Sequence, residues 1–188
     1  MELYQYFQLF HKIDQQTFDL LSSNFKSKAY HKGDYIIEEG QVQKELLFVN
    51  KGVQMCFLNK EGKQHVIAFT YPPNILTVPD SFIFQAPSKY FLQCLTDSEF
   101  DSISFDILQQ LFDQSQQIER LFRKMTEAVL VGLIQRYMEL KALTIEDRFK
   151  AFTLRSPQLL QLIPHKYIAS YLDIDPTNFS KLFNSIKI

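Results

Sequence analysis

The residues best suited to specific binding lie near the end of the sequence. Thr177, Asn178, Lys181 and Asn184 follow Pro176 at helical spacing, so they are expected to share one exposed stripe. Amide, hydroxyl and ammonium groups on one helix face are the types that contact base edges and phosphates in the major groove of DNA. The full set of predicted DNA contacts is His165, Lys166, Thr177, Asn178, Ser180, Lys181 and Asn184.

Other chemistry is poorly represented. A jelly-roll metalloenzyme needs clustered ligands such as an H-x-H pair, and the histidines at 11, 31, 65 and 165 are dispersed. Cys56 and Cys94 are too few for an iron–sulfur cluster, and their apolar, strand-like surroundings predict reduced, buried thiols. His65, the one candidate haem ligand, is interpreted as a surface residue of a strand. We therefore expect no enzyme, no catalytic residue, no metal and no cofactor.

The polar stripe belongs to a compact helical unit predicted over residues 144–188. Helices are expected over 145–154, 159–163, 165–172 and 176–186, with breaks at Ser156-Pro157 and Pro164. The three-residue connector between the last two helices and the small Ala169 at their crossing predict a helix-turn-helix. The alternative is a generic helical hairpin. The predicted internal core of the helix-turn-helix consists of Ile168, Leu172, Ile174, Phe179 and Leu182.

Before this unit, residues 114 to 143 predict one long helix, free of proline. It carries an apolar stripe that needs a partner. Because the helix is expected to be longer than the preceding domain can cover, a parallel homodimer is favoured over packing on the chain's own barrel. The dimerisation segment is placed at residues 113–143. The predicted dimerisation residues are Ile118, Leu121, Phe122, Met125, Val129 and Leu133.

Residues 1–112 predict the remaining domain. Short helical turns are expected over residues 3–27, and Asp14 is the predicted N-cap of the second. From residue 27 to 104 short β-prone runs alternate with turn residues, and Asn59 to Gly62 is a hairpin signal. This texture predicts a jelly roll or β-roll. The fold class is therefore α+β: an N-terminal β-roll, a long central helix and a C-terminal helix-turn-helix domain.

Bulk properties restrict the partners further. The formal net charge is −1, which argues against indiscriminate coating of nucleic acid. No apolar run approaches the roughly 20 residues that span a bilayer. The first residues, MELYQYFQLFHKID, lack the basic and apolar regions of a secretory signal. We expect a cytoplasmic protein with no membrane partner.

Two groups of motifs carry a resemblance to a known family. Lys32 to Gly40 (KGDYIIEEG) and Phe48 to Gly52 (FVNKG) are similar to the cyclic-nucleotide-binding roll of the catabolite activator/FNR (Crp/Fnr) superfamily. At the C-terminal end, EDRF at 146–149, SPQLL at 156–160 and IPHKYIASYL at 163–172 resemble a branch common in Bacteroidetes. The resemblance implies a homodimeric transcription regulator with double-stranded DNA and RNA polymerase as partners.

The effector site departs from the family's pattern. Members that bind cyclic AMP carry a Gly-Glu pair, which meets the ribose, and an Arg, which pairs with the cyclic phosphate. Residues 73–90 contain neither, and Lys89 offers only a single point charge. We therefore predict no tight binding of cyclic AMP, and an unknown small-molecule effector or none. The candidate effector pocket consists of Leu76, Pro79, Asp80, Ser81, Ser88 and Lys89.

One further departure leaves an alternative open. The final helix has Phe183 where a basic residue is expected, so attraction to phosphate is weak. The alternative function is therefore a dimeric interaction module of the same fold that binds protein and not DNA.

Overall fold

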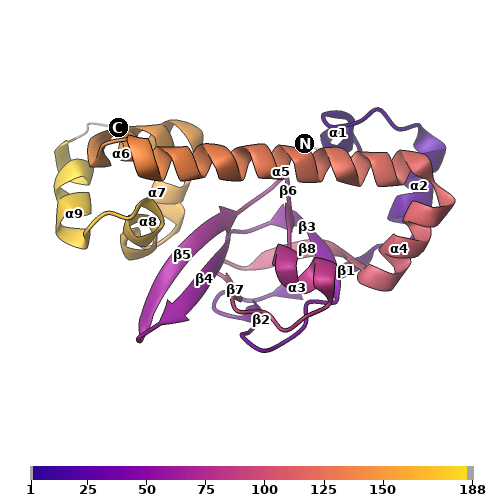
Figure 1. Cartoon of the computed structure of the whole chain (residues 1–188), viewed down its shortest axis with the longest axis horizontal. Helices are drawn as coiled ribbons and strands as arrows, with labels where there is room; N and C mark the ends of the chain where they lie inside the picture. The colour runs from indigo at the N-terminus through magenta and orange to yellow at the C-terminus, as the bar shows by residue number, and fades with distance from the viewer. Residues whose placement is uncertain (1, 186–188) are drawn as a thin grey trace.

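The computed structural model describes residues 2–185. Its strands are β1 (Lys26–Tyr30), β2 (Tyr35–Ile37), β3 (Glu45–Lys51), β4 (Gln54–Lys60), β5 (Lys63–Thr70), β6 (Asn74–Leu76), β7 (Phe91–Cys94) and β8 (Ser98–Ser104). They form two four-stranded antiparallel sheets, in the orders β1-β8-β3-β6 and β2-β7-β4-β5. The two sheets make the β-roll at the centre of the molecule (Figure 1).

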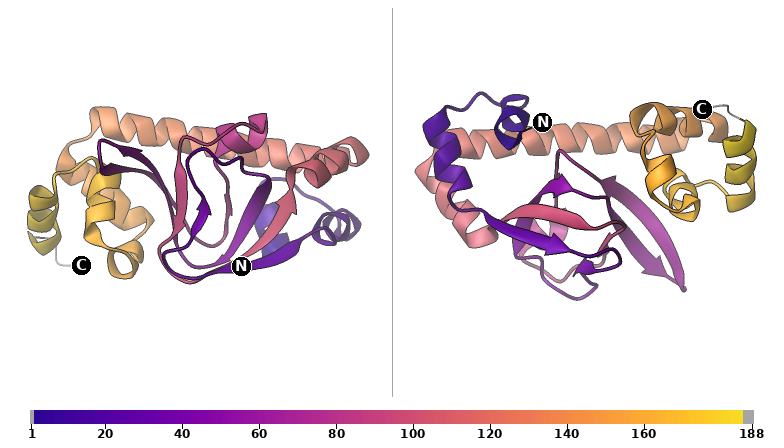
Figure 2. Two further views of the ribbon diagram at one scale, coloured as in Figure 1. Left: turned by 90° about the horizontal axis from the view of Figure 1, so that it is seen from below. Right: turned by 180° about the vertical axis from the view of Figure 1, so that it is seen from behind.

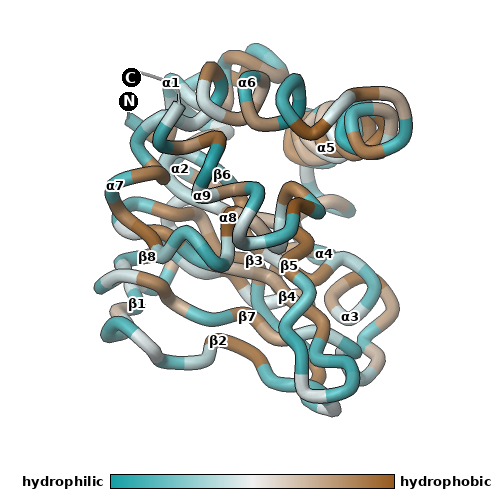
Figure 3. The backbone as a smooth tube through the Cα atoms, turned by 90° about the vertical axis from the view of Figure 1, so that its left-hand side faces the viewer, coloured by the Kyte–Doolittle hydropathy of each residue, from teal (hydrophilic) through white to brown (hydrophobic). Residues whose placement is uncertain are grey.

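The β4–β5 hairpin turns where the sequence predicts. Lys60 pairs with Lys63, and Glu61 and Gly62 between them have φ values of 54° and 74°. Two consecutive residues with positive φ give the turn type whose twist matches that of paired strands. The hairpin has a hydrophilic tip and lies beside the C-terminal helices (Figures 2 and 3).

Two short helices precede the roll, α1 (Leu3–Gln8) and α2 (Gln15–Ser22). The side chain of Asp14 accepts a hydrogen bond of 2.7 Å from the backbone N–H of Thr17, which confirms the predicted N-cap. Hydrogen bonding by the Thr17 side chain, and then by its backbone N–H, holds the pKa of the Asp14 carboxyl below its usual range, because it favours the charged form.

A long helix crosses the roll. The roll carries α3 (Pro79–Phe84) between β6 and β7, and α4 (Phe105–Gln114) follows β8. The long helix α5 (Gln116–Ala142) contains 27 residues and runs along one side of the roll from the α2 and α4 end to the C-terminal helices (Figure 1). The predicted helix began at residue 114, but Ser115 separates α4 from α5 and caps α5 by accepting from the N–H of Ile118.

Four helices follow: α6 (Ile145–Arg155), α7 (Leu159–Leu162), α8 (His165–Leu172) and α9 (Pro176–Ser185). They gather beyond the roll at the far end of α5 (Figures 1 and 2). The predicted end of the last helix, Ile186, lies outside the described residues. None of the described helices is both long and apolar enough to span a bilayer.

The hydrophobic core has three parts. One lies between the two sheets, and a second joins α1, α2, α4 and the first half of α5 to the roll. The third joins the roll to the C-terminal helices, so that buried Val66 and Phe57 share a cluster with Phe149, Ile168 and Leu172. The predicted fold class, an α+β chain with a β-roll, a long helix and C-terminal helices, is confirmed.

Both cysteines are free thiols in neighbouring strands of one sheet. Burial raises the pKa of the Cys56 thiol to about 12, and burial also raises the pKa of Cys94. Both side chains therefore remain protonated and unreactive at neutral pH.

Candidate nucleic-acid interface

The candidate interface is built on the pair α8 and α9. Between them Asp173 adopts φ 53°, a left-handed conformation that Asp tolerates better than most residues. The N–H of Ile174 donates to the carbonyl of Ala169 over 3.0 Å, which closes the end of α8. Ala169 is buried in one apolar cluster with Ile174 and Phe179, so a larger side chain there would displace its neighbours.

The start of α9 is fixed by Asp175. Its carboxylate accepts from the backbone N–H of Thr177 at 2.8 Å and of Asn178 at 3.4 Å. These bonds, the one from Thr177 above all, hold the pKa of Asp175 below its usual range, and the charge of Lys63 adds to the effect. Pro176 follows at the first helical position, where its missing N–H is harmless.

Six of the seven predicted DNA contacts are exposed to solvent. One side of α9 is buried through Phe179, so the polar residues are displayed on the opposite side. Ser180 also donates to the carbonyl of Pro176 within the helix. The exposed residues are Lys166, Thr177, Asn178, Ser180, Lys181 and Asn184.

His165 is placed differently from the prediction. Its ring lies 4.3 Å from the ring of Phe183 and 5.4 Å from that of Phe179, measured between centroids. Its Nε2 is 3.1 Å from the carbonyl oxygen of Leu160, within hydrogen-bond distance. His165 is therefore engaged inside the helical unit, and its predicted contact with DNA is not supported. The same packing explains why position 183 carries Phe, where a basic residue was expected, because the Phe183 ring packs against His165.

A residue outside the predicted set also shapes the interface. Arg148 on α6 is buried, and its guanidinium lies 3.9 Å from the carboxylate of Asp173 in the α8–α9 turn. Its Nε has no hydrogen-bond partner among the described residues. Arg148 stands in the EDRF motif, but nothing in that motif indicates that its partner lies 25 positions later.

The end of α5 is joined to the helical unit by charged groups. Arg136 donates to the carbonyl of Tyr171, and its guanidinium lies 4.0 Å from the centroid of the Tyr171 ring. Burial lowers the pKa of Arg136. The negative charge of buried Glu139 raises it and so offsets part of this effect. Glu139 also accepts from Arg155 of α6 at 2.8 Å. These contacts connect α5 with both α6 and α8.

The predicted dimerisation stripe divides into two parts. Ile118, Leu121, Phe122 and Met125 are buried in the chain's own core against the roll and α1, α2 and α4. This corrects the prediction for Ile118, Leu121 and Met125, because a partner cannot reach them, whereas Phe122 also lines an apolar groove beside α5. Val129 and Leu133 are exposed, and the exposed apolar residues around them on α5 are Leu130, Val131, Ile134, Tyr137, Met138 and Leu140.

Most of this exposed set was not predicted from the sequence. Thr126, Leu130, Leu133, Tyr137 and Leu140 follow one another at intervals of four and three residues, as core positions do in a coiled coil. That heptad spacing was the available signal. The predicted stripe instead continued the helical period of the first half, which the chain covers itself.

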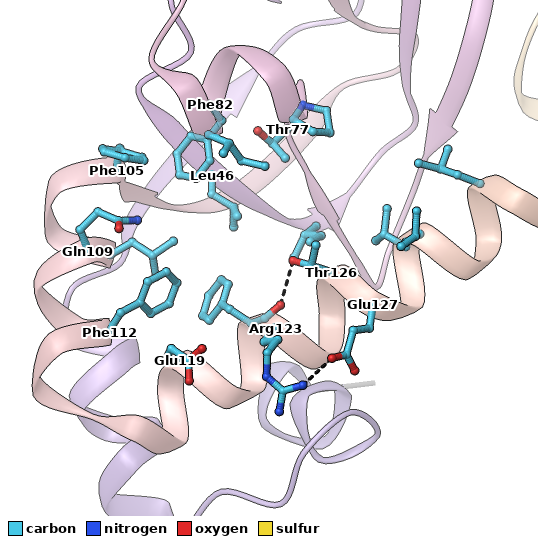
Figure 4. A pocket seen from close by; sticks show the side chains of 18 residues that line it. Leu46, Thr77, Phe82, Phe105, Gln109, Phe112, Glu119, Arg123, Thr126 and Glu127 are labelled. Carbon is cyan, nitrogen blue, oxygen red and sulfur yellow. Dashed lines mark hydrogen bonds and ion pairs between the residues drawn. The ribbon is translucent and has the colours of Figure 1, made fainter.

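A groove of about 640 Å³ opens beside the exposed half of α5. Apolar side chains from α3, α4 and α5, among them Phe82, Phe105 and Phe112, line it together with Leu46 and Ile75 of the roll (Figure 4).

The rim of the groove is charged. Arg123 and Lys124 both pair with Glu127. These pairs, that with Lys124 first, hold the pKa of the Glu127 carboxyl below its usual range. The rim residues Glu119, Arg123 and Glu127 come from α5 (Figure 4).

The candidate effector residues do not assemble as predicted. Ser81 accepts from the N–H of Gln43 and donates to the carbonyl of Ala86, and Ser88 makes two hydrogen bonds with the backbone of Tyr90. Both hydroxyls are therefore engaged by the chain itself, which corrects their assignment as ligand contacts.

The other four effector residues are spread over different surroundings. Leu76 is buried between the sheets, whereas Asp80 is half-buried and Lys89 is exposed. Pro79, alone of the six candidates, lines the groove beside α5. A lysine at the surface and a proline in an apolar groove do not form a phosphate site.

Comparison with known proteins agrees with this architecture. Residues 27–115 match the family model "Cyclic nucleotide-binding domain". FixK2 from Bradyrhizobium japonicum is similar in structure, with 17% identity and a TM-score of 0.74, over 86% of this chain and 83% of FixK2. The c-di-GMP responsive global regulator CLP from Xanthomonas campestris has 16% identity and a TM-score of 0.66, over 92% and 91% of the two chains.

A third similar structure is the catabolite activator protein of Thermus thermophilus. Its identity is 18% and its TM-score 0.60, over 94% of this chain and 85% of the other. No curated protein sequence gives a significant match. Residues 27–115 thus resemble a cyclic nucleotide-binding domain, and the chain shares the fold of FixK2, CLP and the catabolite activator protein.

Proposed function

We propose that the chain is a homodimeric, sequence-specific DNA-binding transcription regulator of the Crp/Fnr type. The observation that carries the proposal is the pair α8 and α9, with Ala169 buried in their common apolar cluster, a three-residue turn and a polar outer face on α9. This is the anatomy of a helix-turn-helix whose second helix enters the major groove. RNA polymerase is the further partner that such a function implies.

The outer face of α9 suits both kinds of DNA contact. The amide of Asn178 has the donor and acceptor needed to pair with the edge of an adenine, whereas Lys181 offers a charge to a phosphate. Lys166 on α8 is exposed, and we assign it to the DNA phosphate backbone, where a contact fixes register and carries no sequence information. Asn178 is accordingly the residue proposed to read sequence.

A second copy of the chain is the proposed partner of the exposed half of α5. The apolar groove at α3 and α4 is continuous with this half, since Val129, Leu130 and Leu133 belong to both. A parallel pair of α5 helices would cover both surfaces at once, at heptad spacing. It would also present two α9 helices to successive major grooves, about 34 Å apart.

Selection from random duplex DNA tests the proposal. We expect the wild-type protein to enrich a palindromic sequence with half-sites about ten base pairs apart. Asn178→Ala should lower affinity by about 1–3 kcal/mol and relax specificity at one base pair. Lys181→Ala should weaken all sequences alike and reduce the salt slope by about one. Lys89 is an exposed lysine on the roll, so Lys89→Ala is the matched control. It should change neither the affinity for DNA nor the salt slope.

We also propose that cyclic AMP does not bind tightly. The support is that residues 73–90 contain no arginine and that the Ser81 and Ser88 hydroxyls are held by backbone groups. Titration calorimetry should show no heat of binding at micromolar concentrations. Micromolar or tighter affinity would contradict the proposal and reopen the search for an effector, which is an unknown small molecule or absent.

A dimeric protein-interaction module is the second candidate. It is favoured by the sparse charge of the interface, since Lys181 is the one cation in the sequence from 176 to 185 and the exposed Asp173 and Asp175 lie at its start. If selection at low salt enriches no duplex while the protein remains dimeric, this candidate replaces the first.

A further inference from the structure

The helical unit α6–α9 is fixed to the roll at the outer edge of β5. This strand is the last of its sheet and pairs with β4 on one side only. Because successive residues of a strand point their backbone groups to opposite sides, Gln64 and Val66 share the unpaired side. A strand edge of this kind presents free N–H and C=O groups to whatever lies beside it.

Ser170 of α8 occupies that edge. Its hydroxyl donates to the carbonyl of Gln64 at 3.0 Å and accepts from the N–H of Val66 at 3.1 Å. One side chain thus takes the place of a neighbouring strand at two consecutive outward groups. The hairpin lies beside the C-terminal helices in two views of the molecule (Figure 2).

Apolar contacts surround these hydrogen bonds. Val66 and Phe57 lie in one buried cluster with Ile168 and Leu172 of α8. The rings of Phe69 on β5 and Tyr171 on α8 are 5.2 Å apart between centroids. This contact holds the inner side of α8 and leaves the outer side of α9 exposed to solvent.

Another hydroxyl pair lies further along the same boundary. Tyr71, just after β5, is 2.6 Å from the hydroxyl of Ser156 at the end of α6. By contrast, only Leu143 and Thr144 connect α5 to α6 along the chain. The contact with β5 therefore orients the helical unit against the roll, in addition to the contacts that Arg136 and Glu139 of α5 make with α8 and α6.

We propose that Ser170 is a positioning residue, which holds α8 on the edge of β5 and thereby sets the direction in which α9 meets DNA. The inference rests on the proposed function, because it assumes that α9 contacts DNA. Ser170 itself is assigned no contact with DNA. The inference also connects the β4–β5 hairpin to the interface, since a change in the hairpin would be transmitted to α9 without passing through the effector region.

Full-length Ser170→Ala tests the proposal by two independent measurements. The first is amide hydrogen exchange at Val66, which needs no DNA and should become at least about tenfold faster once the edge opens. The second is affinity for a duplex selected by the wild-type protein, which should fall about tenfold as the fraction of correctly oriented units falls. Ser170→Thr, which keeps the hydroxyl, should restore both.

Thr153→Val is the matched control. It removes a hydroxyl of α6 that donates only to Lys150 within its own helix, so it should leave both measurements unchanged. Tyr71→Phe removes the second link and should produce the same two effects in smaller size.

Each outcome has a defined meaning. Faster Val66 exchange together with weaker DNA binding supports the proposal. Unchanged exchange in Ser170→Ala overturns the contact, and faster exchange with unchanged affinity overturns the positioning role. Weaker binding with normal exchange also overturns it, because Ser170 would then act by touching DNA. If the wild-type protein selects no duplex, the proposed function fails, whereas the exchange measurement still decides the contact.

Discussion

The two halves of α5 have similar apolar content and opposite surroundings. From Ile118 to Met125 the apolar residues are buried against the chain's own roll and its N-terminal helices. From Val129 to Leu140 they are exposed beside an apolar groove. The difference teaches that periodicity in a sequence indicates that a face will be covered and leaves open whether the cover is the same chain or a second copy.

The largest expected effect comes from the buried half. Leu121→Ala truncates a side chain that is 0% exposed, so it removes buried apolar surface and leaves a cavity. We expect the free energy of unfolding to fall by about 3 kcal/mol, measured by urea denaturation. A loss below about 1 kcal/mol would show that this half is loosely packed and would break the comparison.

A smaller effect is expected from the exposed half. Leu133 is 52% exposed, so Leu133→Glu should leave the fold of one chain intact while placing a carboxylate between two α5 helices. The dissociation constant of the dimer should rise at least about thirtyfold, measured by analytical ultracentrifugation. Gln135→Glu adds the same charge at a neighbouring exposed polar position and serves as control. A dimer that tolerates Leu133→Glu would place the partner elsewhere.

The end of α5 provides the next test. Glu139→Gln removes the charge that Arg136 and Arg155 share, and the Glu139 side chain is 9% exposed. Because Arg155 is partly solvated, we expect a loss of about 1–2 kcal/mol in unfolding free energy. Glu127→Gln, in the same helix and also beside two cations but exposed, should shift the denaturation midpoint little. Equal effects of the two changes would argue that burial of Glu139 is unimportant.

The smallest expected effect comes from Gly132, where one substitution distinguishes the stability of the single chain from that of the dimer. A Cβ at Gly132 would meet nothing within 4 Å, so Gly132→Ala should stabilise the helix by about 0.5–1 kcal/mol in thermal or urea unfolding. If the second copy approaches closely at Gly132, the same change will weaken the dimer while it stabilises the chain. An unchanged dimer constant would place the interface on the stripe through Leu130 and Tyr137.

Local signals were sufficient to predict most of the fold. Pro176 and Asp175 mark the start of α9, Asp14 that of α2, and Gly62 the β4–β5 turn, because each acts on the backbone within a few residues. The exposed side of α9 followed from the same period. The start of the long helix was predicted at residue 114, two residues too early, because Ser115 neither interrupts the apolar pattern nor changes the composition.

Sites that depend on distant partners could not be predicted. Ser81 resembles a ligand contact in the sequence, but its hydrogen bonds go to Gln43 and Ala86. Arg148 and Ser170 lie in motifs that carry the family resemblance, but neither motif indicates the partners of these side chains, which lie in other elements. A hydroxyl or a guanidinium reveals what it can bind, and only the fold decides which group reaches it first.

The contact at β5 has a consequence for aggregation between copies of the chain. A free strand edge is a template on which strands from other molecules can pair, and proteins commonly cover it with another element. In this chain α8 is that cover, with Ser170 meeting the outward groups of Gln64 and Val66. The helical unit proposed to read DNA therefore also covers the edge strand β5 and prevents it from pairing with a strand of another molecule. Its loss by proteolysis would leave a roll prone to join others edge to edge.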